Sequence, residues 1–492
     1  MRDKNPIRLG TLILFGLLSI SAVILGVSRL SYLHPGPAIA AGGLAIIVLV
    51  VGWVLAGLWR ARFVSHTRVL GLEFLADRWQ SFEPKERDSV ILYEQISIVL
   101  SIAELAYHNV DEIHLLRAFP GTKFKSGAFV LQPGKGMPHV LKLDSVANIK
   151  EEEKRYQHCV AGRLGRVAGE PWVPRHRNGK IEGQDWGAIA YNLAGAGPST
   201  LDRLQSFGKY YLAHDNSQQI EDALGCIFEA LRPWWQNAKV ENDPCASFRR
   251  TTLRGEYDRL TRKQRQMETG IRQVGQALQI QTLQAVDADQ RYVDLEGDIR
   301  LGNPLNWVRD VFEAEQPGTW ITQDTLRRDS IVHGDLHANN ILISQEMGGQ
   351  LAAWVIDFPH THVGPTVQDV ARLEADIKFG LLPDDSLRHL SMGDMWHFEV
   401  SILPQSDQFP PPMAALTPGP IEQADQQLHK AHNSVCLLRN EARKYMSGDN
   451  ACPYYLALLH ATLPILYYRD RTPRQKLYAF ISAALVCERL SG

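Results

Sequence analysis

The chain has 492 residues, a formal net charge of −2 and 22% charged side chains, a composition typical of a globular protein large enough for two or three domains. Such a balanced charge gives no support for nucleic-acid binding, so no nucleic acid partner is expected. The six cysteines include no CxxC pair. Their pattern argues against a structural zinc site and a disulfide framework, and it suits a reducing compartment.

Two apolar segments of about 20 residues lie at the N-terminus, at residues 9–28 and 38–59. A helix of that length can cross about 30 Å of hydrocarbon, so the sequence predicts a transmembrane helical hairpin over residues 1–62. A cleaved signal peptide is the alternative interpretation. Its apolar region would be long, however, and a second span follows at once.

Positive charges flank this hairpin on both sides. The flanking residues are Arg2, Lys4, Arg8, Arg60, Arg62 and Arg68. The connection between the spans carries only Arg29, so the positive-inside rule places both ends in the cytoplasm. We therefore expect a multi-pass inner-membrane protein that contacts the membrane through residues 9–59, with a cytoplasmic N-terminus and a cytoplasmic main domain.

Helical periodicity follows the hairpin. Apolar residues that include Val69 and Leu70 suggest one helix, and residues 91–107 suggest another. We favour a juxtamembrane helical segment at residues 63–110 that packs on the next domain. A separate binding module is the alternative.

From Ile113 onward the period changes to that of strands. Residues 113–118, 128–132 and 139–143 predict a three-stranded antiparallel meander. The turn between the first two strands, residues 120–127, contains two glycines, and such a turn can lay backbone N–H groups over phosphates. It lacks the GxxxxGK[ST] pattern of a P-loop.

Lys142 lies inside the third predicted strand, on the opposite face from the leucines beside it. It is either a solvated edge residue or a phosphate ligand that faces a cleft. Residues 148–164 predict a helix, in which Glu152 lies one turn before Tyr156 and points inward with it. We therefore expect a Lys142–Glu152 ion pair, with Glu153 as the alternative partner.

A further apolar strand at residues 186–193 ends in a small-residue linker, AGAGP, which suits a hinge between two lobes. Its backbone from Tyr191 to Leu193 could pair with an adenine edge. Beyond it, residues 248–266 carry seven basic side chains and few acidic ones. This run is either a solvated helical face or a patch for a partner, an anionic substrate or a membrane surface.

The most informative stretch is residues 331–343, IVHGDLHANNILI, followed by residues 353–358, AWVIDF. Two short buried strands would place Asp335, Asn340 and Asp357 at neighbouring strand ends. Phosphoryl transfer needs such a set: one carboxylate orients a hydroxyl, while an amide and a second carboxylate hold magnesium on the phosphates.

Three features follow Asp357. His360 and His362 form an HxH pair, for which a loop role is favoured over metal binding because no third ligand is evident. Residues 367–379 predict an amphipathic helix, in which Asp369 is expected to cap or anchor the polar loop. Residues 404–420 are rich in proline and predict a surface loop.

The HGDLHxxN motif with a strand ending in Asp-Phe resembles the aminoglycoside phosphotransferase and choline kinase branch of the protein-kinase-like fold, over roughly residues 112–490. The helix DVARLEADIKF is similar, more particularly, to the ternary-complex-associated phosphotransferase-like domains of bacterial conflict systems. The resemblance implies a bilobal α+β fold behind the transmembrane hairpin. A small antiparallel-sheet lobe would occupy residues 111–193, and a large helical lobe residues 194–492, with a basic helical insert at about 240–300.

The resemblance also implies roles for the motif residues. Asp335 would be the catalytic base that accepts the proton of the acceptor hydroxyl. Asn340 and Asp357 would bind Mg²⁺. His333 and His337 would brace the catalytic loop by hydrogen bonds.

ATP would be held mainly by the sheet lobe. Lys142, paired with Glu152, would hold the α- and β-phosphates. The remaining nucleotide contacts are assigned to Gly121, Ser126, Gly127, Tyr191 and Leu193. The third residue of the metal triplet, glycine in protein kinases, is Pro359 here, which argues against a protein-kinase activation switch.

The expected function is a membrane-anchored ATP- and Mg²⁺-dependent phosphotransferase. It would transfer a γ-phosphoryl group to a hydroxyl of an unidentified small molecule or protein, in a bacterial conflict, defence or signalling system. The alternative is a catalytically silent nucleotide-binding scaffold that recruits partners at the membrane. The basic insert is a candidate surface for protein partners. An integral transporter or channel is disfavoured because two spans are too few.

Overall fold

The computed structural model describes residues 68–70, 112–118, 127–134, 136, 139–164, 170–181, 184–192, 203–236, 244–248, 263–295, 299–313, 329–345, 350–403, 425–446 and 451–491. The chain divides into two compact units. The first comprises Met1–Leu70 and Leu100–Ile113, and its described part is strand β1 (Arg68–Leu70) with the first two residues of β2. The second comprises Gly71–Val99 and His114–Gly492, and it carries every feature discussed below.

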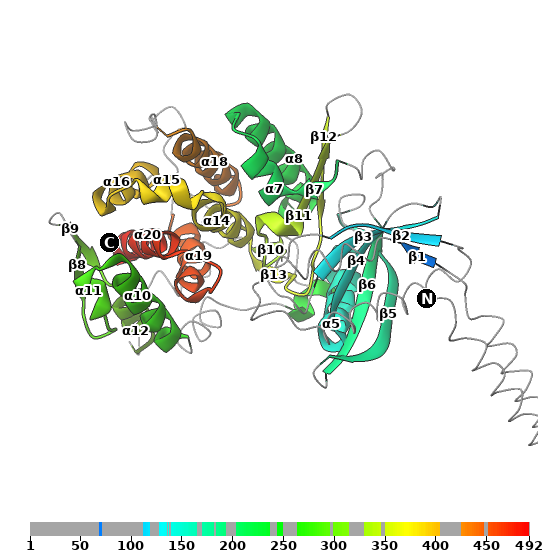
Figure 1. Ribbon diagram of the computed structural model, residues 1–492, viewed down its shortest axis with the longest axis horizontal. Helices are drawn as coiled ribbons and strands as arrows, with labels where there is room; N and C mark the ends of the chain where they lie inside the picture. Colours follow the sequence, from blue (N-terminus) through cyan, green and yellow to red (C-terminus); the bar gives the residue numbers. More distant parts are fainter. Residues whose placement is uncertain are drawn as a thin grey trace, which may run out of the picture. The chain divides into compact units, whose positions relative to one another are not determined.

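A sheet forms the first half of the second unit (Figure 1). Its strands lie in the order β2 (Glu112–Ala118), β3 (Gly127–Pro133), β4 (His139–Ser145), β6 (Gln184–Asn192) and β5 (Glu170–Ile181). The pairs β3–β4, β4–β6 and β5–β6 are antiparallel. The predicted succession of three neighbouring strands is confirmed, and strand β5 was not predicted.

Strand β5 has a composition that hides it. Its sequence, EPWVPRHRNGKI, contains two prolines and an Asn-Gly pair, which are typical of turns. Its pairing with β6 is irregular between Pro171 and Val173 and between Arg175 and Gly179. Because β5 is last in the strand order, proline and glycine are tolerated there at bulges.

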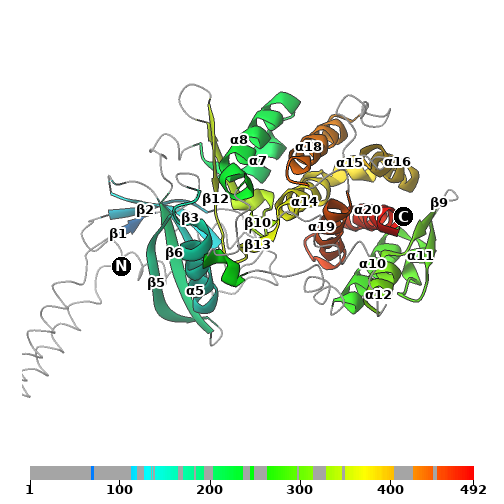
Figure 2. The same ribbon diagram turned by 180° about the vertical axis from the view of Figure 1, so that it is seen from behind.

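Helix α5 (Val146–Arg155) packs on this sheet and continues into the π-helical turn η2 (Tyr156–Val160), as Figure 2 shows from behind. Together they cover the helix predicted at residues 148–164. The helix starts at Val146 because Ser145 Oγ accepts a hydrogen bond from Asn148 N. Its two buried residues are Ile149 and Glu152, so the inward orientation predicted for Glu152 is confirmed.

The rest of the second unit is mainly helical. Its helices are α7 (Phe207–Ala213), α8 (Ser217–Gln236), η4 (Pro244–Phe248), α10 (Gln264–Leu278), α11 (Gln281–Gln284), α12 (Pro304–Glu313), α14 (Val367–Asp376), η7 (Ile377–Leu381), α15 (Asp384–Arg388), α16 (Met392–Ile402), α18 (Gln426–Arg443), α19 (Cys452–Thr462), η9 (Leu463–Tyr467) and α20 (Pro473–Ser491). The predicted α+β class is therefore confirmed.

Three small sheets complete this part. They are formed by β7 (Gln205–Ser206), β11 (Ile341–Gln345) and β12 (Leu351–Val355), by β10 (Asp329–Val332) with β13 (His362–Pro365), and by β8 (Tyr292–Leu295) with β9 (Ile299–Gly302). The strands of the first two sheets flank Asp335, Asn340 and Asp357.

A fully buried ionic network holds α14 in the helical part. Glu374 pairs with Arg439 at 2.5 Å, and Lys378 pairs with Glu399 at 2.6 Å, all four side chains having no exposed surface. The hydroxyls of Tyr454, Tyr478 and Ser482 donate further hydrogen bonds to the two glutamates. Since α14 carries part of the candidate site, this network fixes the helix on which that site rests.

Three expectations need correction. Arg68–Leu70 is a strand, although the run around Val69 and Leu70 suggested a helix; three residues with a β-branched centre suffice for a short strand. Cys159 and Cys245 form a disulfide, although the cysteine pattern argued against one. A separation of 86 residues gives no local pattern that would reveal such a pair.

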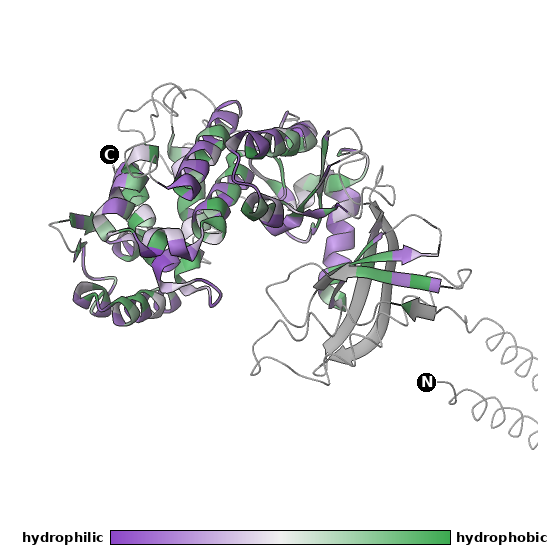
Figure 3. Cartoon of the chain, turned by 45° about the horizontal axis from the view of Figure 1, so that its top comes forward, coloured by the Kyte–Doolittle hydropathy of each residue, from purple (hydrophilic) through white to green (hydrophobic). Residues whose placement is uncertain are grey.

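The predicted multi-pass inner-membrane localisation is also wrong. Among the residues that the structure describes, no helix combines the length and apolar character needed to cross a bilayer. Figure 3 shows hydrophilic residues along the described helices, and the longest of them, α8, contains Glu221, Asp222, Glu229 and Arg232. Residues 9–59, most of 63–110, and residues 249–262 and 404–420 lie outside the described residues.

Candidate active site

The β11–β12 hairpin places Asn340 and Asp357 together. Ile341 is the register partner of Val355, and Ile356 N donates a hydrogen bond of 3.0 Å to Asn340 O. Asn340 therefore precedes one strand at the end of the hairpin where Asp357 follows the other. This is the juxtaposition that the sequence predicts.

Asp357 has an unusual backbone conformation. Its φ is 75°, in the left-handed region that residues other than glycine rarely adopt. Such conformations persist where the surrounding structure imposes them, and they are concentrated at functional sites. The Oδ1 atom of Asp357 lies 2.5 Å from Lys142 Nζ.

Lys142 bridges two carboxylates. Its Nζ lies 2.6 Å from Glu152 Oε2, so the predicted ion pair is present, and Asp357 is its second partner. Glu152 is fully buried, and its Oε1 accepts hydrogen bonds from the Tyr191 hydroxyl and, at 3.2 Å, from Phe358 N. Glu153, the alternative partner, is only half-buried. Glu152, which holds Lys142, is thus itself held by Tyr191 of the sheet and by the backbone of Phe358.

Burial and charge act against each other in this cluster. Burial raises the pKa of Glu152, whereas the ammonium group of Lys142 lowers the pKa of Asp357 in spite of burial. The two carboxylates together raise the pKa of Lys142, although burial acts in the opposite direction. Lys142 therefore stays protonated, as a ligand for phosphates must.

Asp335 lies in the loop between β10 and the short turn η6 (Ala338–Asn340). Arg372 Nε and Nη2 lie 3.2 and 3.1 Å from its Oδ1. Burial alone would raise the pKa of Asp335, but the charges of Arg372 and then His337 lower it to about 2. Asp335 is therefore ionised at neutral pH and able to accept a hydrogen bond from a hydroxyl.

Two histidines support this loop, as predicted. His333 Nε2 lies 2.9 Å from the Ile356 carbonyl oxygen, so this nitrogen carries the proton and ties the loop to the end of β12. Burial lowers the pKa of His333, which keeps the ring neutral. His337 Nδ1 accepts a hydrogen bond of 3.3 Å from Asn339 N at the start of η6.

The loop approaches the HxH segment closely at Gly334. Its φ is +78°, and a Cβ there would lie 2.4 Å from the carbonyl oxygen of His360. Only glycine fits this position. His362 Nδ1 lies 2.7 Å from the carbonyl oxygen of His360, and no group of three or more His, Cys, Asp or Glu side chains among the described residues could hold a metal ion. The side chain of His362 is thus held within its own segment, and a loop role for the pair stays a prediction.

Helix α14 anchors the loop from beneath. Asp369 accepts hydrogen bonds from His333 N at 2.8 Å and Gly334 N at 2.9 Å, which confirms the role predicted for it. Asp376 Oδ2 accepts one of 2.8 Å from Ala338 N. Arg372 and Asp376 were missed from the sequence. Their spacing of three and seven residues after Asp369 could have shown that all three face the loop.

The other residues predicted to contact the nucleotide stay predictions, and the structure describes the positions of two of them. Gly127 begins β3 opposite Leu143, and Gly121, Ser126 and Leu193 lie outside the described residues. Tyr191 lies in β6, with β4 on one side and β5 on the other, so its strand is not a free edge for an adenine. Its hydroxyl, rather than its backbone, is what the structure brings to the site.

The donor set suits a magnesium ion. Asn340 Nδ2 donates to the Asp335 carbonyl oxygen at 2.9 Å, which leaves the amide oxygen as the end available to a cation. Lys142 supplies one positive charge between two carboxylates, so a second cation beside Asp357 would balance the charge of the cluster. Mg²⁺ takes oxygen ligands and commonly uses one or two protein groups together with substrate phosphates.

Residues 249–467 match the model of one family, ternary complex associated domain 9. The resemblance to ternary-complex-associated domains is therefore confirmed over this part of the chain. The match includes Asp335, Asn340 and Asp357, whereas Lys142 and Glu152 precede it. No curated protein matches the chain.

Solved structures similar to the chain include three phosphotransferases at low identity. An amicoumacin kinase in complex with AMP-PNP, Ca²⁺ and Ami is 12% identical, with coverages of 80% of this chain and 92% of that chain and a TM-score of 0.35. An ethanolamine kinase from Plasmodium vivax is 12% identical, with coverages of 82% and 89% and a TM-score of 0.35. An aminoglycoside phosphotransferase from Streptomyces rimosus is 14% identical, with coverages of 71% and 98% and a TM-score of 0.33.

Proposed function

We propose that the chain is an ATP- and Mg²⁺-dependent phosphotransferase that transfers a γ-phosphoryl group to a hydroxyl. One observation carries this proposal: Lys142 is held between Glu152 and Asp357, at the end of the hairpin that also bears Asn340. Lys142 and Asp357 are 215 positions apart in the chain, yet the fold brings them into contact. The result is a cluster of one ammonium group and two carboxylates beside the Asn340 end of the hairpin. Phosphoryl transfer depends on such positioning and charge rather than on covalent chemistry by the protein.

Each residue has a distinct part in this proposal. Lys142 binds the α- and β-phosphates, and Glu152 keeps its ammonium group in place. Asp357 and Asn340 would hold the metal ion, which would supply positive charge to neutralise the phosphates. Asp335 orients the acceptor hydroxyl.

The phosphoryl group is transferred in a single displacement. The acceptor oxygen forms a bond to the γ-phosphorus while the bond between that phosphorus and the β,γ-bridging oxygen breaks. Its electron pair leaves with ADP, and the acceptor proton passes to Asp335. Since the pKa of Asp335 is about 2, this carboxylate contributes more by orientation than by base strength.

The acceptor is a hydroxyl-bearing small molecule or a protein. The name of the matched family supports action inside a ternary complex. From the resemblance of the sequence alone, we propose that this complex belongs to a bacterial conflict, defence or signalling system.

The test is ADP formation from Mg-ATP by the full chain, alone and with a panel of hydroxyl-bearing compounds. Asp335→Asn is the control, because it keeps the size of the side chain and removes its charge. We expect the wild type to form ADP at least about 100-fold faster than the variant. Equal rates would discard the catalytic assignment. Thermal stabilisation by Mg-ATP without turnover would instead indicate a nucleotide-binding scaffold.

A further inference from the structure

One face of α14 follows the catalytic loop residue by residue. Asp369, Arg372 and Asp376 are spaced three and four apart, so they lie on the same side of the helix. The two carboxylates accept hydrogen bonds from backbone N–H groups of the loop at its start and its end. Of these three side chains, only that of Arg372 contacts the side chain of Asp335. The loop backbone is thus held without the arginine. Besides Asp335, the guanidinium group hydrogen-bonds the side chain of Tyr468, which helps to keep it in place.

The arginine contact is asymmetric. Both Nε and Nη2 of Arg372 approach the same oxygen, Oδ1, at 3.2 and 3.1 Å. The other oxygen, Oδ2, has His337 Nε2 at 3.8 Å, which is beyond hydrogen-bonding distance. The side chain of Asp335 is one-third exposed, and that of Arg372 only 21% exposed. The buried arginine therefore holds one oxygen and leaves the other accessible.

We propose that Arg372 is a positioning residue for phosphoryl transfer, which holds Asp335 Oδ1 so that Oδ2 receives the hydrogen bond of the acceptor hydroxyl. This inference rests on the proposed function. A guanidinium group suits the task because its planar fork fixes the orientation of a carboxylate, whereas an ammonium group acts as a point charge.

The chemistry of the step explains why orientation matters here. The acceptor O–H donates to Oδ2, its oxygen forms the bond to the γ-phosphorus, and the proton moves to Oδ2 as the bond to the bridging oxygen breaks. A carboxylate free to rotate would aim its oxygen at the hydroxyl only part of the time. A misplacement of about 1 Å in such a step can cost about 100-fold in rate.

The experiment measures kcat and KM for Mg-ATP in the full chain, with the fastest acceptor of the panel, or with water where none accelerates ADP formation. We expect Arg372→Met to lower kcat about 100-fold and to change KM less than about twofold. Arg372→Lys, which keeps the charge but not the fork, should recover about a tenth of the wild-type kcat. Arg388→Met is the matched control. Arg388 lies on α15 with 65% of its side chain exposed, and it pairs only with Asp384 and Asp385.

A second measurement separates positioning from folding. Added guanidinium ion should restore turnover to Arg372→Ala and leave Arg388→Met unchanged. If Arg372→Met does not fold, Arg372→Lys and the rescued Arg372→Ala decide the question.

The two levels of failure are distinguishable. The role of Arg372 is overturned if the wild type is active and Arg372→Met keeps a kcat within threefold of it. A loss confined to KM overturns that role as well. In both cases the proposed phosphotransferase activity stands. A wild type no faster than Asp335→Asn overturns both.

Discussion

At the scale of single residues, the bridging position of Lys142 leads to a prediction for Glu152. Glu152→Gln keeps an oxygen that accepts hydrogen bonds from the Tyr191 hydroxyl and Phe358 N. It removes the negative charge that pairs with Lys142. Lys142 would then pair with Asp357 alone, which is a ligand of the metal ion in the proposed function. We expect KM for Mg-ATP to rise about tenfold, a loss of about 1.4 kcal/mol of binding.

The same substitution should leave stability almost unchanged, because burial already raises the pKa of Glu152 and a neutral side chain avoids that cost. Urea denaturation checks this half, with an expected change within about 1 kcal/mol. Glu153→Gln is the matched control, since Glu153 is the half-buried neighbour. A tenfold KM effect of that control, rather than of Glu152→Gln, would show that the wrong glutamate has been assigned.

The sequence predicts the residues of this cluster but not all of their contacts. The strand period predicts that Lys142 turns away from its leucine neighbours, and the helix period predicts that Glu152 turns inward. That Lys142 also reaches Asp357 depends on how the sheet packs on the hairpin, and no local pattern encodes such packing. The position of Tyr191 in an inner strand could not be predicted for a similar reason, because the strand order that encloses β6 includes the unpredicted β5.

At the scale of elements, the buried ionic network that holds α14 gives a stability prediction. Glu399→Ala leaves the ammonium group of Lys378 buried, with only Glu374, at 3.8 Å, as an acidic neighbour. An uncompensated buried charge of this kind costs about 3–5 kcal/mol, measurable as a lower free energy of unfolding in urea. Replacing both partners, Glu399→Leu with Lys378→Met, should cost less than half of that.

An exposed ion pair supplies the comparison for this network. Arg232 and Glu229 pair on α8 with 39% and 62% of their side chains exposed, so Glu229→Ala should cost less than about 1 kcal/mol. If Glu399→Ala costs no more than that, the network does not fix α14. The sequence could not predict this network, because its members come from four helices whose packing only the structure gives.

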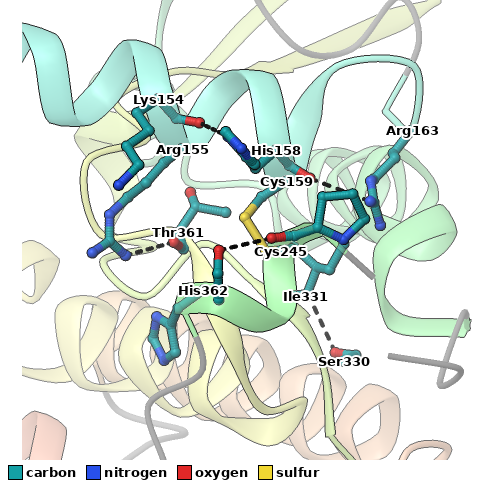
Figure 4. Close-up of a disulfide and its surroundings, with 12 residues drawn as sticks. Lys154, Arg155, His158, Cys159, Arg163, Cys245, Ser330, Ile331, Thr361 and His362 are labelled. Carbon is teal, nitrogen blue, oxygen red and sulfur yellow. Dashed lines mark hydrogen bonds between the residues drawn. A yellow bond between two sulfur atoms is a disulfide. The ribbon is translucent and has the colours of Figure 1, made fainter. Parts of the chain in front are cut away.

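At the scale of the whole molecule, the Cys159–Cys245 disulfide links the end of the helix that carries Glu152 to η4. Figure 4 shows it beside Arg155, whose Nη1 donates a hydrogen bond of 2.7 Å to the Thr361 carbonyl oxygen. Because the bond closes a loop of 86 residues, its loss should lower the free energy of unfolding by about 2–4 kcal/mol. The measurement compares urea denaturation of the wild type with that of Cys159→Ser/Cys245→Ser.

The free cysteines provide the control for that comparison. A Cys226→Ser variant changes a half-buried thiol that forms no disulfide and should move the denaturation midpoint little. Identical midpoints for the wild type and the double variant would mean that the two sulfurs are not bonded in solution.

The pH dependence of stability is also a property of the whole molecule, and His139 makes the clearest contribution. Burial in β4 lowers the pKa of His139 to about 4, from 6.5 when the side chain is solvated. His139 therefore becomes protonated below about pH 6.5 in the unfolded chain but only below about pH 4 in the folded chain. The stability that comes from keeping His139 neutral is complete above pH 6.5 and is lost progressively as the pH falls towards 4.

This loss can be isolated by substitution. Burial acts on His333 in the same direction, whereas Asp335, with a pKa of about 2, remains ionised throughout this window. We expect His139→Leu to flatten the fall in the free energy of unfolding between pH 6.5 and 4 by up to about 3 kcal/mol. Urea denaturation across that range measures both slopes. Equal slopes would show that His139 binds its proton equally in the folded and unfolded chains, which would contradict the burial of its side chain.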